Sequence, residues 1–581
     1  MIPSIQTRNF YSAPAPQAKK ETPTRGGLGD SFQKSDWRDQ LSSLKTQLVA
    51  QEELGVSRVV NSRQAGEILA RYKDDQTPTE DLKVIACRAV ADQDMLPEFT
   101  EEVKTAAAAF TQAPGPDHPS VVDLRHLPFV SVDNGDLNPS TGLLEHASKD
   151  IDQVEYAEKL PNGDIRMMVG IADVDSLVKK GDVIDNQAMR HGATVYTDDM
   201  IFPMIPPNLS EGHTSLNEKV DRLAMVKQFD VTPEGEIKGL KVFRGYVHNR
   251  AQMAYDSVNE YLTEGSGPQP PQLQDRVLAE QMELQSEAAQ RLRHFFHAKG
   301  SLDLESSEAR AQIQDGKVKG MKREFQSVAK DKVKFNMMAA NISSMNVLDQ
   351  AGMPTLRRIV KTPEKWDRIK ELAGKYDYQL PSDPNAKALN EFLENRKEAD
   401  PGAHEELSSQ VVRLVGRGEY VVAQPGEPIE GHFCLAAPDY GHTTAPNRRA
   451  PDLVNQRIEK AYAEGRECPY SVEEMQVLAE HFNQQEEAIK QIEREVHRSA
   501  EAKLMKDKIG QSFDGRIHKE LRNGTLVRLQ EPFVTGLVKQ KLEGDSGDPI
   551  RVKLEKVDVE KGHIDFSVAT EQVVEGFLLR H

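Results

Sequence analysis

The pattern of apolar and polar residues predicts helices in the first part of the chain. Apolar side chains recur there at helical spacing, as at Leu41, Leu44 and Leu48, and strand-like alternation is absent. The run TPTE at 77–80 matches an N-cap, a first-turn proline and a capping-box acid. We therefore expect a helical N-terminal domain over residues 36–115.

The middle of the chain, residues 116–507, has the pattern of a mixed α/β domain. Short β-branched runs predict strands at 164–174, 193–204 and 221–231. Helical patterns follow at 280–298, 337–348 and 363–372. A long helix should run from Ser471 to about Lys506, beginning with a capping box formed by Ser471 and Glu474. Its apolar stripe, which we expect to pack in the core, is Met475, Leu478, Phe482, Ile489, Ile492 and Val496.

The two ends of the chain differ from this middle part. Five short strands separated by glycine-bearing turns predict an OB-fold barrel at 508–581. Residues 1–35 are rich in Pro, Ala, Gly, Ser and Thr and predict a disordered tail. The fold class is therefore α+β and multidomain.

Composition narrows the function classes. The formal net charge of −18 over 581 residues argues against a protein that coats nucleic acid, so any nucleic-acid path must be local. The three cysteines, Cys87, Cys434 and Cys468, have neither zinc spacing nor an even count, which favours a reducing compartment. No apolar run is long enough to span a membrane and no secretory signal is evident, so we expect a cytoplasmic protein with no membrane association.

Three aspartates are candidates for chemistry. Asp133, Asp150 and Asp152 each end or follow a short β-favouring run, and residues i and i+2 of an extended segment share a face. Converging carboxylates are the ligands that Mg²⁺ takes in proteins. From spacing alone, a solvated acidic loop explains the same residues, because Asp is common in turns.

A series of sequence blocks resembles the ribonuclease II and ribonuclease R (RNB) family of exoribonucleases. The blocks, in family order, include LPFVSVD at 127–133, DID at 150–152, FPMIP at 202–206, SLNEKVDRLA at 215–224 and YGHTTAPNRRAPDLVNQR at 440–457. The resemblance implies a Mg²⁺-dependent hydrolase, with Mn²⁺ as a possible substitute. It would degrade single-stranded RNA from the 3′ end and release nucleoside 5′-monophosphates.

The resemblance also assigns roles to individual residues. Asp133, Asp150 and Asp152 would hold the metal, and Gln153 stands where the family has a fourth aspartate. Arg448 would contact the scissile phosphate, with Arg449 beside it and paired to Asp452. The implied RNA-binding residues are Tyr196 and Tyr255 in the channel, together with Arg448 and Arg449. The barrel lacks the aromatic that the family usually has near Gly524, and Phe513 and Phe533 are its remaining candidates for binding RNA. Each aromatic residue could instead be ordinary core packing.

Several departures keep a second hypothesis open. Asp133 and Asp150 are 17 positions apart, much farther than in the family, so a loop is inserted and Asp136 or Glu145 could replace Asp133. Lys334 and Phe335 stand where acidic residues are common. The predicted N-terminal helices replace cold-shock barrels, and they could bind a protein partner or duplex RNA, or buttress the catalytic domain. The alternative function is a catalytically decayed RNB-fold protein that binds RNA or regulates.

Overall fold

Three helices open the part of the chain that the structure describes. This computed structural model describes residues 63–569 except 76, 139, 142, 305–307 and 315. The predicted tail at 1–35 and the leucines at 41, 44 and 48 lie outside the described residues. The helices are α3 (Arg63–Lys73), α4 (Leu82–Asp92) and α5 (Glu101–Ala108). The helical character predicted for this region is confirmed for the described residues.

The start of α4 differs from the prediction. Its N-cap is Asp81, whose side chain accepts a hydrogen bond from the Lys83 backbone N–H, and Thr77 does not cap the helix. Thr79 instead accepts a hydrogen bond from the Asp81 N–H. A carboxylate satisfies the free N–H groups of a helix start and is also favoured there by the helix dipole, so Asp81 is the better cap.

A six-stranded sheet forms the centre of the fold. Its strands, in spatial order, are β1 (Val121–Asp123), β10 (Ile237–Ala254), β2 (Phe129–Asp133), β5 (Gln153–Lys159), β6 (Ile165–Ala172) and β9 (Asp221–Val231). The 18-residue strand β10 also pairs with β9, so the strands from β10 to β9 close into a ring.

The predicted strands at 164–174 and 221–231 are confirmed as β6 and β9. The predicted strand at 193–204 is instead a small hairpin, β7 (Val195–Tyr196) and β8 (Ile201–Phe202). Sequence patterns did not single out β5, β10 or helix α6 (Val183–His191).

Helices cover the sheet and confirm the predicted order of strands before helices. Helices α8 (Arg276–Ala298) and α9 (Val328–Gln350) pack on β6 and β9, where Met167 and Phe229 meet Leu292 and Phe335. Helix α7 (Tyr255–Leu262) follows directly after β10, and α10 (Trp366–Gly374) corresponds to the helix predicted at 363–372. Beyond α10 come α11 (Ala386–Ala399) and α12 (Pro401–Val415), after strand β13 (Thr355–Val360) and before its partner β14 (Gly418–Ala423).

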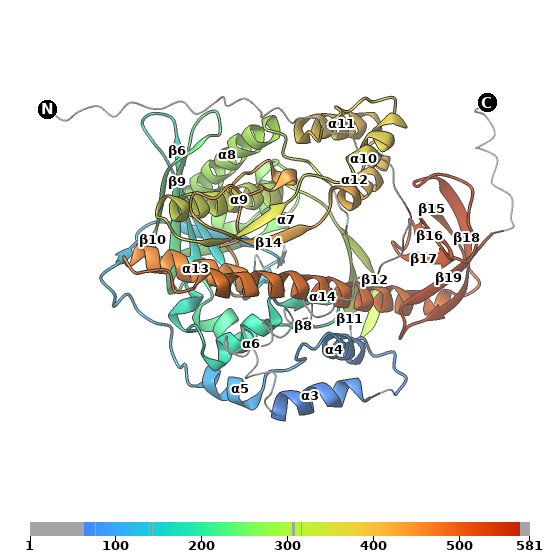
Figure 1. The fold of residues 1–581 in the computed structure, drawn as a ribbon, viewed down its shortest axis with the longest axis horizontal. Coiled ribbons are helices and arrows are strands. Elements are labelled where there is room, and N and C mark those ends of the chain that lie inside the picture. The colour runs from blue at the N-terminus through green and yellow to red at the C-terminus, as the bar shows by residue number, and fades with distance from the viewer. Residues whose placement is uncertain are drawn as a thin grey trace, which may run out of the picture. The chain divides into compact units, whose positions relative to one another are not determined.

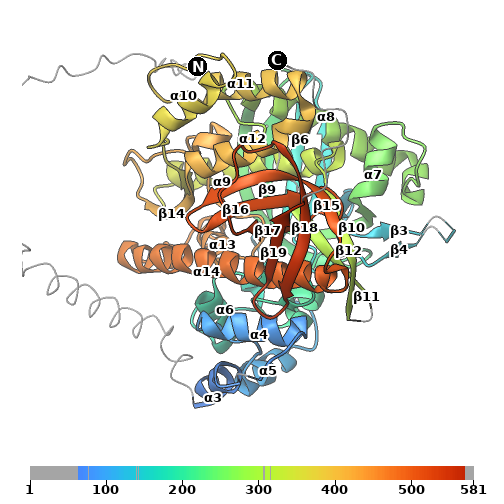
Figure 2. The same cartoon turned by 90° about the vertical axis from the view of Figure 1, so that its right-hand side faces the viewer.

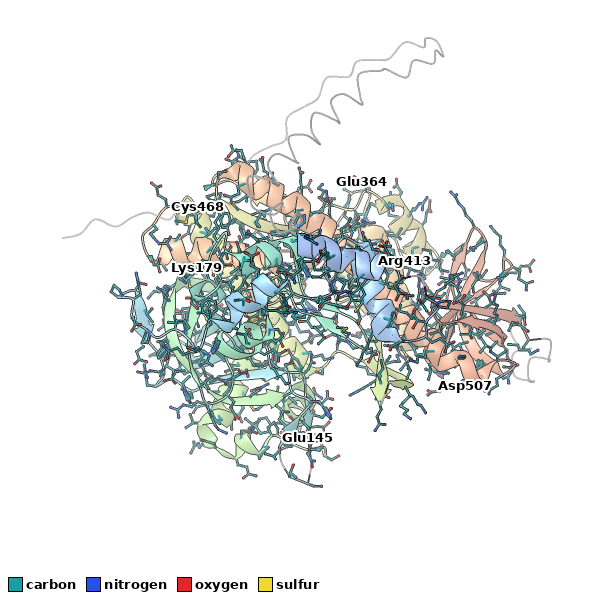
Figure 3. All side chains as sticks on the ribbon, turned by 90° about the horizontal axis from the view of Figure 1, so that it is seen from below. Glu145, Lys179, Glu364, Arg413, Cys468 and Asp507 are labelled. Atoms are coloured by element: carbon teal, nitrogen blue, oxygen red, sulfur yellow. The ribbon has the colours of Figure 1, made fainter. Side chains whose placement is uncertain are left out.

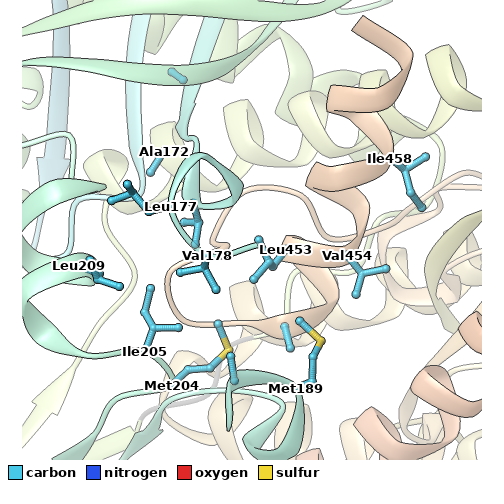
Figure 4. Packing of buried hydrophobic residues seen from close by; sticks show 14 of the residues in the cluster. Ala172, Leu177, Val178, Met189, Met204, Ile205, Leu209, Leu453, Val454 and Ile458 are labelled. Carbon is cyan, nitrogen blue, oxygen red and sulfur yellow. The ribbon is translucent and has the colours of Figure 1, made fainter. Parts of the chain in front are cut away.

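The main core lies around helix α13 (Ala450–Ala463). Leu453 on this helix lies beside Val178 from the segment between β6 and β9 (Figure 4). Val454 and Ile458 on the helix and Met204 from the same segment belong to the same buried cluster. This packing ties the loop that precedes α13 to the strands of the sheet.

Helix α14 (Val472–Met505) is the longest of the described elements, and Figure 1 shows it crossing the view toward the barrel strands. The predicted capping box of Ser471 and Glu474 is present, and all six residues of the predicted apolar stripe are buried. The stripe packs partly against Ala86 and Val90 of α4, so α4 and α14 share one apolar cluster.

The last strands form the predicted five-stranded closed barrel (Figure 2). Its spatial order is β15 (Ser512–Leu521), β16 (Gly524–Leu529), β17 (Thr535–Val538), β19 (His563–Val568) and β18 (Pro549–Asp558). Ala502, Leu504 and Met505, at the end of α14, belong to the same apolar cluster as the barrel interior. Within residues 63–569, none of the described helices is long and apolar enough to cross a membrane.

Candidate active site

Asp133 lies at the end of β2, next to the end of β10. The register of this parallel pair places Asp133 beside Ala254, so Tyr255, the first residue of α7, follows directly at the same edge. Asp133 is half-buried, and its Oδ2 is shielded from solvent and accepts no hydrogen bond from the described residues.

The inserted segment after Asp133 forms a separate hairpin. Strands β3 (Asp136–Leu137) and β4 (Leu144–Glu145) pair with each other, with Asp136 opposite Glu145. Both side chains are exposed: Asp136 bonds to the His146 ring, and Glu145 accepts a hydrogen bond from Asn138. Glu145 lies at the lower edge of the view in Figure 3. The insert therefore bulges outward, and Asp133 remains the candidate ligand.

Asp150 and Asp152 flank Ile151 immediately before β5. The backbone of Ile151 bonds to the Ser215 hydroxyl and the Leu216 N–H, and its side chain is fully buried, which fixes the two aspartates on the other side. The Tyr196 hydroxyl donates to Asp150 Oδ2 over 3.5 Å.

Arg448 is the charged partner of Asp152. Its Nε donates to Asp152 Oδ2 at 3.0 Å, and the Asn447 backbone N–H donates to Asp152 Oδ1 at 3.3 Å. Asp152 is 3% exposed, whereas the Arg448 side chain is 41% exposed. The guanidinium thus forms an ion pair with a buried carboxylate and presents its remaining N–H groups outward.

The three aspartates share a poorly solvated, negative site. Burial raises the pKa of Asp133 to about 7, and the charges of Asp152 and Asp150 add to the effect. Burial likewise raises the pKa of Asp152 to about 6, against the opposing charge of Arg448. The pKa of Asp150 is also raised, mainly by burial. The single positive charge of Arg448 therefore does not offset the combined effect of burial and mutual repulsion on the three aspartates.

The donors suit a hard cation with an open coordination sphere. Asp133 Oδ2 is a buried carboxyl oxygen without a hydrogen-bond partner among the described residues, and carboxylate oxygen is the ligand type of Mg²⁺. Among the described residues, no three His, Cys, Asp or Glu side chains are grouped so that they could hold a metal ion. An ion here would take its remaining ligands from water and phosphate, as Mg²⁺ usually does.

The loop before α13 is held by buried polar contacts. Asp452 Oδ1 accepts hydrogen bonds from the backbone N–H groups of Thr444 and Ala445 and from Arg449 Nη2. The predicted pairing of Arg449 with Asp452 is confirmed. Lys227 contributes from β9, where its Nζ donates to the Thr443 carbonyl.

Lys227 also forms an ion pair of 3.0 Å with Glu459, and both side chains are fully buried. Removing one partner of such a pair leaves an uncompensated charge, so the pair fixes α13 relative to β9. The position of Arg448 depends on this frame.

The two candidate tyrosines both border the aspartates. Burial and then the charge of Asp150 and Asp152 raise the pKa of Tyr196, although Arg448 opposes this. Burial, followed by the charges of Asp133 and Glu155, raises the pKa of Tyr255. Tyr196 thus lies at the site through its bond to Asp150, and Tyr255 lies there because it follows Ala254, the neighbour of Asp133. The Tyr255 ring also packs against the apolar cluster that contains Val258.

Two further charged residues at the site carry no clear sequence signal. Glu155 on β5 is 2% exposed and forms an ion pair of 3.1 Å with Lys332 of α9, whose side chain is also buried. The positive charge of Lys332 lowers the pKa of Asp133. Gln153 donates from Nε2 to Asp133 Oδ1 over 3.5 Å. Alternation along β5 could have indicated Glu155, since it shares a face with Gln153.

Lys334 and Phe335 take different positions from Lys332. Lys334 is exposed, and Phe335 is buried in the cluster with Phe229 and Phe296. The basic residue of α9 that lowers the pKa of Asp133 is therefore Lys332. It stands two positions before Lys334, the residue that the family resemblance singled out.

The barrel aromatics have distinct environments. Phe513 packs against the barrel interior, as expected for a residue that fills the barrel. Phe533 is half-buried and lies between two guanidinium groups, 4.6 Å from Arg323 and 5.2 Å from Arg528, measured to the ring centroid.

Family models place these features in a known class. Residues 121–465, more than half of the chain, match the RNB domain, and residues 511–569 match the RNase II-type exonuclease C-terminal S1 domain. The chain belongs to the RNB family. The RNB match contains the three aspartates, both tyrosines and Arg448.

Curated relatives of this RNB protein are ribonucleases R. Ribonuclease R 1 of Lactococcus lactis is 27% identical over 521 residues, which are 84% of this chain and 61% of the relative. Ribonuclease R of Escherichia coli is 29% identical over 489 residues, which are 78% of this chain and 58% of the relative. The chain thus spans about three fifths of the length of these relatives.

A solved structure confirms the RNB fold. Mycoplasma genitalium RNase R in complex with ribose methylated single-stranded RNA superposes with a TM-score of 0.73 at 21% identity, covering 84% of this chain and 78% of that one. The likeness extends over most of the RNB protein, and at this identity it concerns the fold.

The raised pKa of Asp133 predicts a pH-dependent stability. Folded Asp133 keeps its proton up to about pH 7, whereas an unfolded aspartate releases it near 3.8, so the folded form binds more protons between these values. The free energy of unfolding should therefore fall as pH rises from about 4 to 7. In thermal unfolding with EDTA, Asp133→Asn should gain stability relative to wild type on going from pH 5 to pH 8. Asp136→Asn, on the exposed hairpin, is the matched control. A stability difference for Asp133→Asn that does not change with pH would contradict the assignment.

Proposed function

We propose that this chain is a hydrolytic exoribonuclease that degrades single-stranded RNA from its 3′ end to nucleoside 5′-monophosphates. The observation that carries the proposal is the constellation of Asp133, Asp150 and Asp152 with Arg448 at one edge of an RNB-family sheet. The two relatives named above are both ribonucleases R, which supports the same activity. The structure of Mycoplasma genitalium RNase R with single-stranded RNA supports RNA as the ligand.

In this proposal Arg448 binds the scissile phosphate. Its Nε is held by Asp152, so the planar guanidinium is oriented before substrate arrives. Its outward N–H groups can donate to two phosphoryl oxygens and stabilise the charge that develops on them. The Asn447 N–H keeps Asp152 in place from the other side.

Mg²⁺, or Mn²⁺ in its place, would be held by Asp133, Asp150 and Asp152, with the carbonyl of Gln153 as a neutral donor. Binding would draw the three carboxylates closer together than they lie in this structure. Such an ion supplies charge stabilisation at the phosphoryl group and a more acidic bound water. Tyr196 would steady Asp150 through its hydroxyl, and Lys332 would limit the net negative charge around Asp133.

Tyr196 and Tyr255 would stack the last bases of the strand. Their rings border the carboxylates, and stacking accepts every base in turn. Arg449 would act beside Arg448 by holding the loop, while Phe513 and Phe533 would contribute from the barrel. Preference for RNA over DNA would come from contacts to the 2′-hydroxyl.

The remaining parts of the proposal concern organisation. We infer a division into a tail (1–35), helical domain (36–115), catalytic domain (116–507) and barrel (508–581). The packing of α4 on α14 supports a buttressing role for the helices, and a protein partner could also bind there. Cys87, Cys434 and Cys468 are free, which supports a reducing, cytoplasmic location.

Replacing Asp152 tests catalysis directly. Asp152→Asn keeps an acceptor for the Asn447 N–H but removes a charge, so turnover should fall roughly a thousandfold while RNA binding persists. Release of mononucleotides from labelled poly(A) with Mg²⁺ measures turnover, and equilibrium binding measures the affinity for RNA. Arg448→Ala should behave similarly, and Asp136→Asn should retain wild-type activity. RNA binding by wild type without mononucleotide release at any Mg²⁺ or Mn²⁺ concentration would favour the catalytically decayed alternative.

Replacing the tyrosines tests the channel. Tyr255→Ala removes a stacking surface worth about 1–3 kcal/mol per base, so the rate should fall or the shortest product should lengthen. Tyr255→Phe keeps the ring and should behave as wild type. Tyr196→Ala should resemble Tyr255→Ala, whereas Tyr196→Phe isolates the hydroxyl bond to Asp150. If both alanine variants give wild-type product ladders, the tyrosines serve core packing alone.

A further inference from the structure

A two-stranded ribbon, β11 (Glu308–Gln314) and β12 (Lys317–Glu324), has one face against the protein. The strands pair so that Ala311 lies opposite Met321 and Ile313 opposite Val318. Val318 and Met321 pack against the barrel cluster, and Ala311 and Ile313 pack near Leu82, Ile85 and Val559. The ribbon is therefore fixed between the barrel, α4 and α14.

The other face of the ribbon is basic and open. Lys317, Lys319 and Lys322 are exposed, and none of them forms an ion pair with any residue in the described part of the chain. Four of the eight residues in β12 are Lys or Arg, against one acid, although the whole chain carries a net charge of −18. Positive charge is thus concentrated on this strand of a chain that is acidic as a whole.

An exposed aromatic ring follows the basic strand. Phe325 is 64% exposed, and the Arg323 guanidinium lies 5.1 Å from its centroid. The same guanidinium contacts Phe533 of the barrel and forms an ion pair with Glu405 of α12. These contacts restrain Arg323, and the Phe325 ring packs against its guanidinium.

The ribbon also reaches the nuclease site. The Ala311 N–H donates to Asp198 Oδ1 at 2.9 Å, and Asp198 is two residues beyond Tyr196, whose hydroxyl contacts Asp150. Asp198 is further bonded to His497 of α14. Figure 1 shows β11 and β12 between β8 and the barrel strands.

We propose that the β11–β12 ribbon binds single-stranded RNA, with its lysines on the phosphates and Phe325 stacking a base, and leads the strand from the barrel toward Tyr196. The inference rests on the proposed function for its ligand. Lysines on a backbone path combined with an aromatic platform are what sequence-tolerant single-strand binding requires.

The test is equilibrium binding of labelled poly(A) in EDTA, where no turnover occurs, over a series of salt concentrations. Lys317→Gln, Lys319→Gln and Lys322→Gln together should weaken long-strand binding and reduce the log–log salt slope by about 2, at roughly 0.7 per phosphate contact on single strands. Phe325→Ala should weaken binding about fivefold or more, whereas Phe325→Trp keeps an aromatic surface and should bind as wild type does. Binding of a tetranucleotide should change little, because it fills only the aspartate site.

The matched control is Lys241→Gln, Lys365→Gln and Lys387→Gln, three exposed lysines on other elements, which should leave affinity and slope unchanged. Unchanged long-strand affinity and slope in both ribbon variants would overturn the proposal and leave the basic face to another acidic ligand, such as a protein. Binding in EDTA, combined with the release of mononucleotides from the same poly(A) in Mg²⁺, separates the two proposals. Wild type that binds through the ribbon but never releases mononucleotides refutes the exoribonuclease alone.

Discussion

The burial of carboxylates without enough positive charge is the constraint on which the rest of the site depends. Asp152 is nearly inaccessible to solvent and is paired with one arginine, while Asp133 has a shielded oxygen that accepts no hydrogen bond from the part of the chain that the structure describes. Buried charge is costly unless it is paired, so the fold either keeps protons on these groups or binds a cation. The raised pKa values of Asp133 and Asp152 show how the structure carries this cost without an ion.

The surrounding frame explains how this arrangement is held. Lys227 and Glu459 form a buried pair between β9 and α13, and Asp452 caps the loop from which Arg448 projects. The insertion between Asp133 and Asp150 is tolerated because it forms its own exposed hairpin and the chain then returns to β5. The same logic extends outward, where the basic ribbon is packed on the barrel by one face and left open on the other.

Sequence patterns predicted those parts of the fold whose local signal is strong. The stripe and capping box of α14, strands β6 and β9, and the barrel were predicted correctly because periodicity and caps are local. The 18-residue β10 escaped notice because it pairs with three neighbours and is only partly buried, and α4 starts at Asp81 because a carboxylate outcompetes the threonine upstream. The aspartates and Arg448 were found through family blocks, whereas the buried pair of Lys332 and Glu155 depends on α9 packing on β5, which no local pattern encodes.

The proposal on which the other proposed roles depend is a cation site at Asp133, Asp150 and Asp152. Anomalous diffraction from crystals soaked in Mn²⁺ tests it most directly, because Mn²⁺ prefers the same oxygen ligands as Mg²⁺. The account predicts an anomalous peak within coordination distance of these carboxylates, with Asp133 Oδ2 among its ligands, and its weakening in Asp152→Asn. The account would be contradicted if wild-type crystals in which Mn²⁺ can reach the site showed no peak there and had the three carboxylates turned apart.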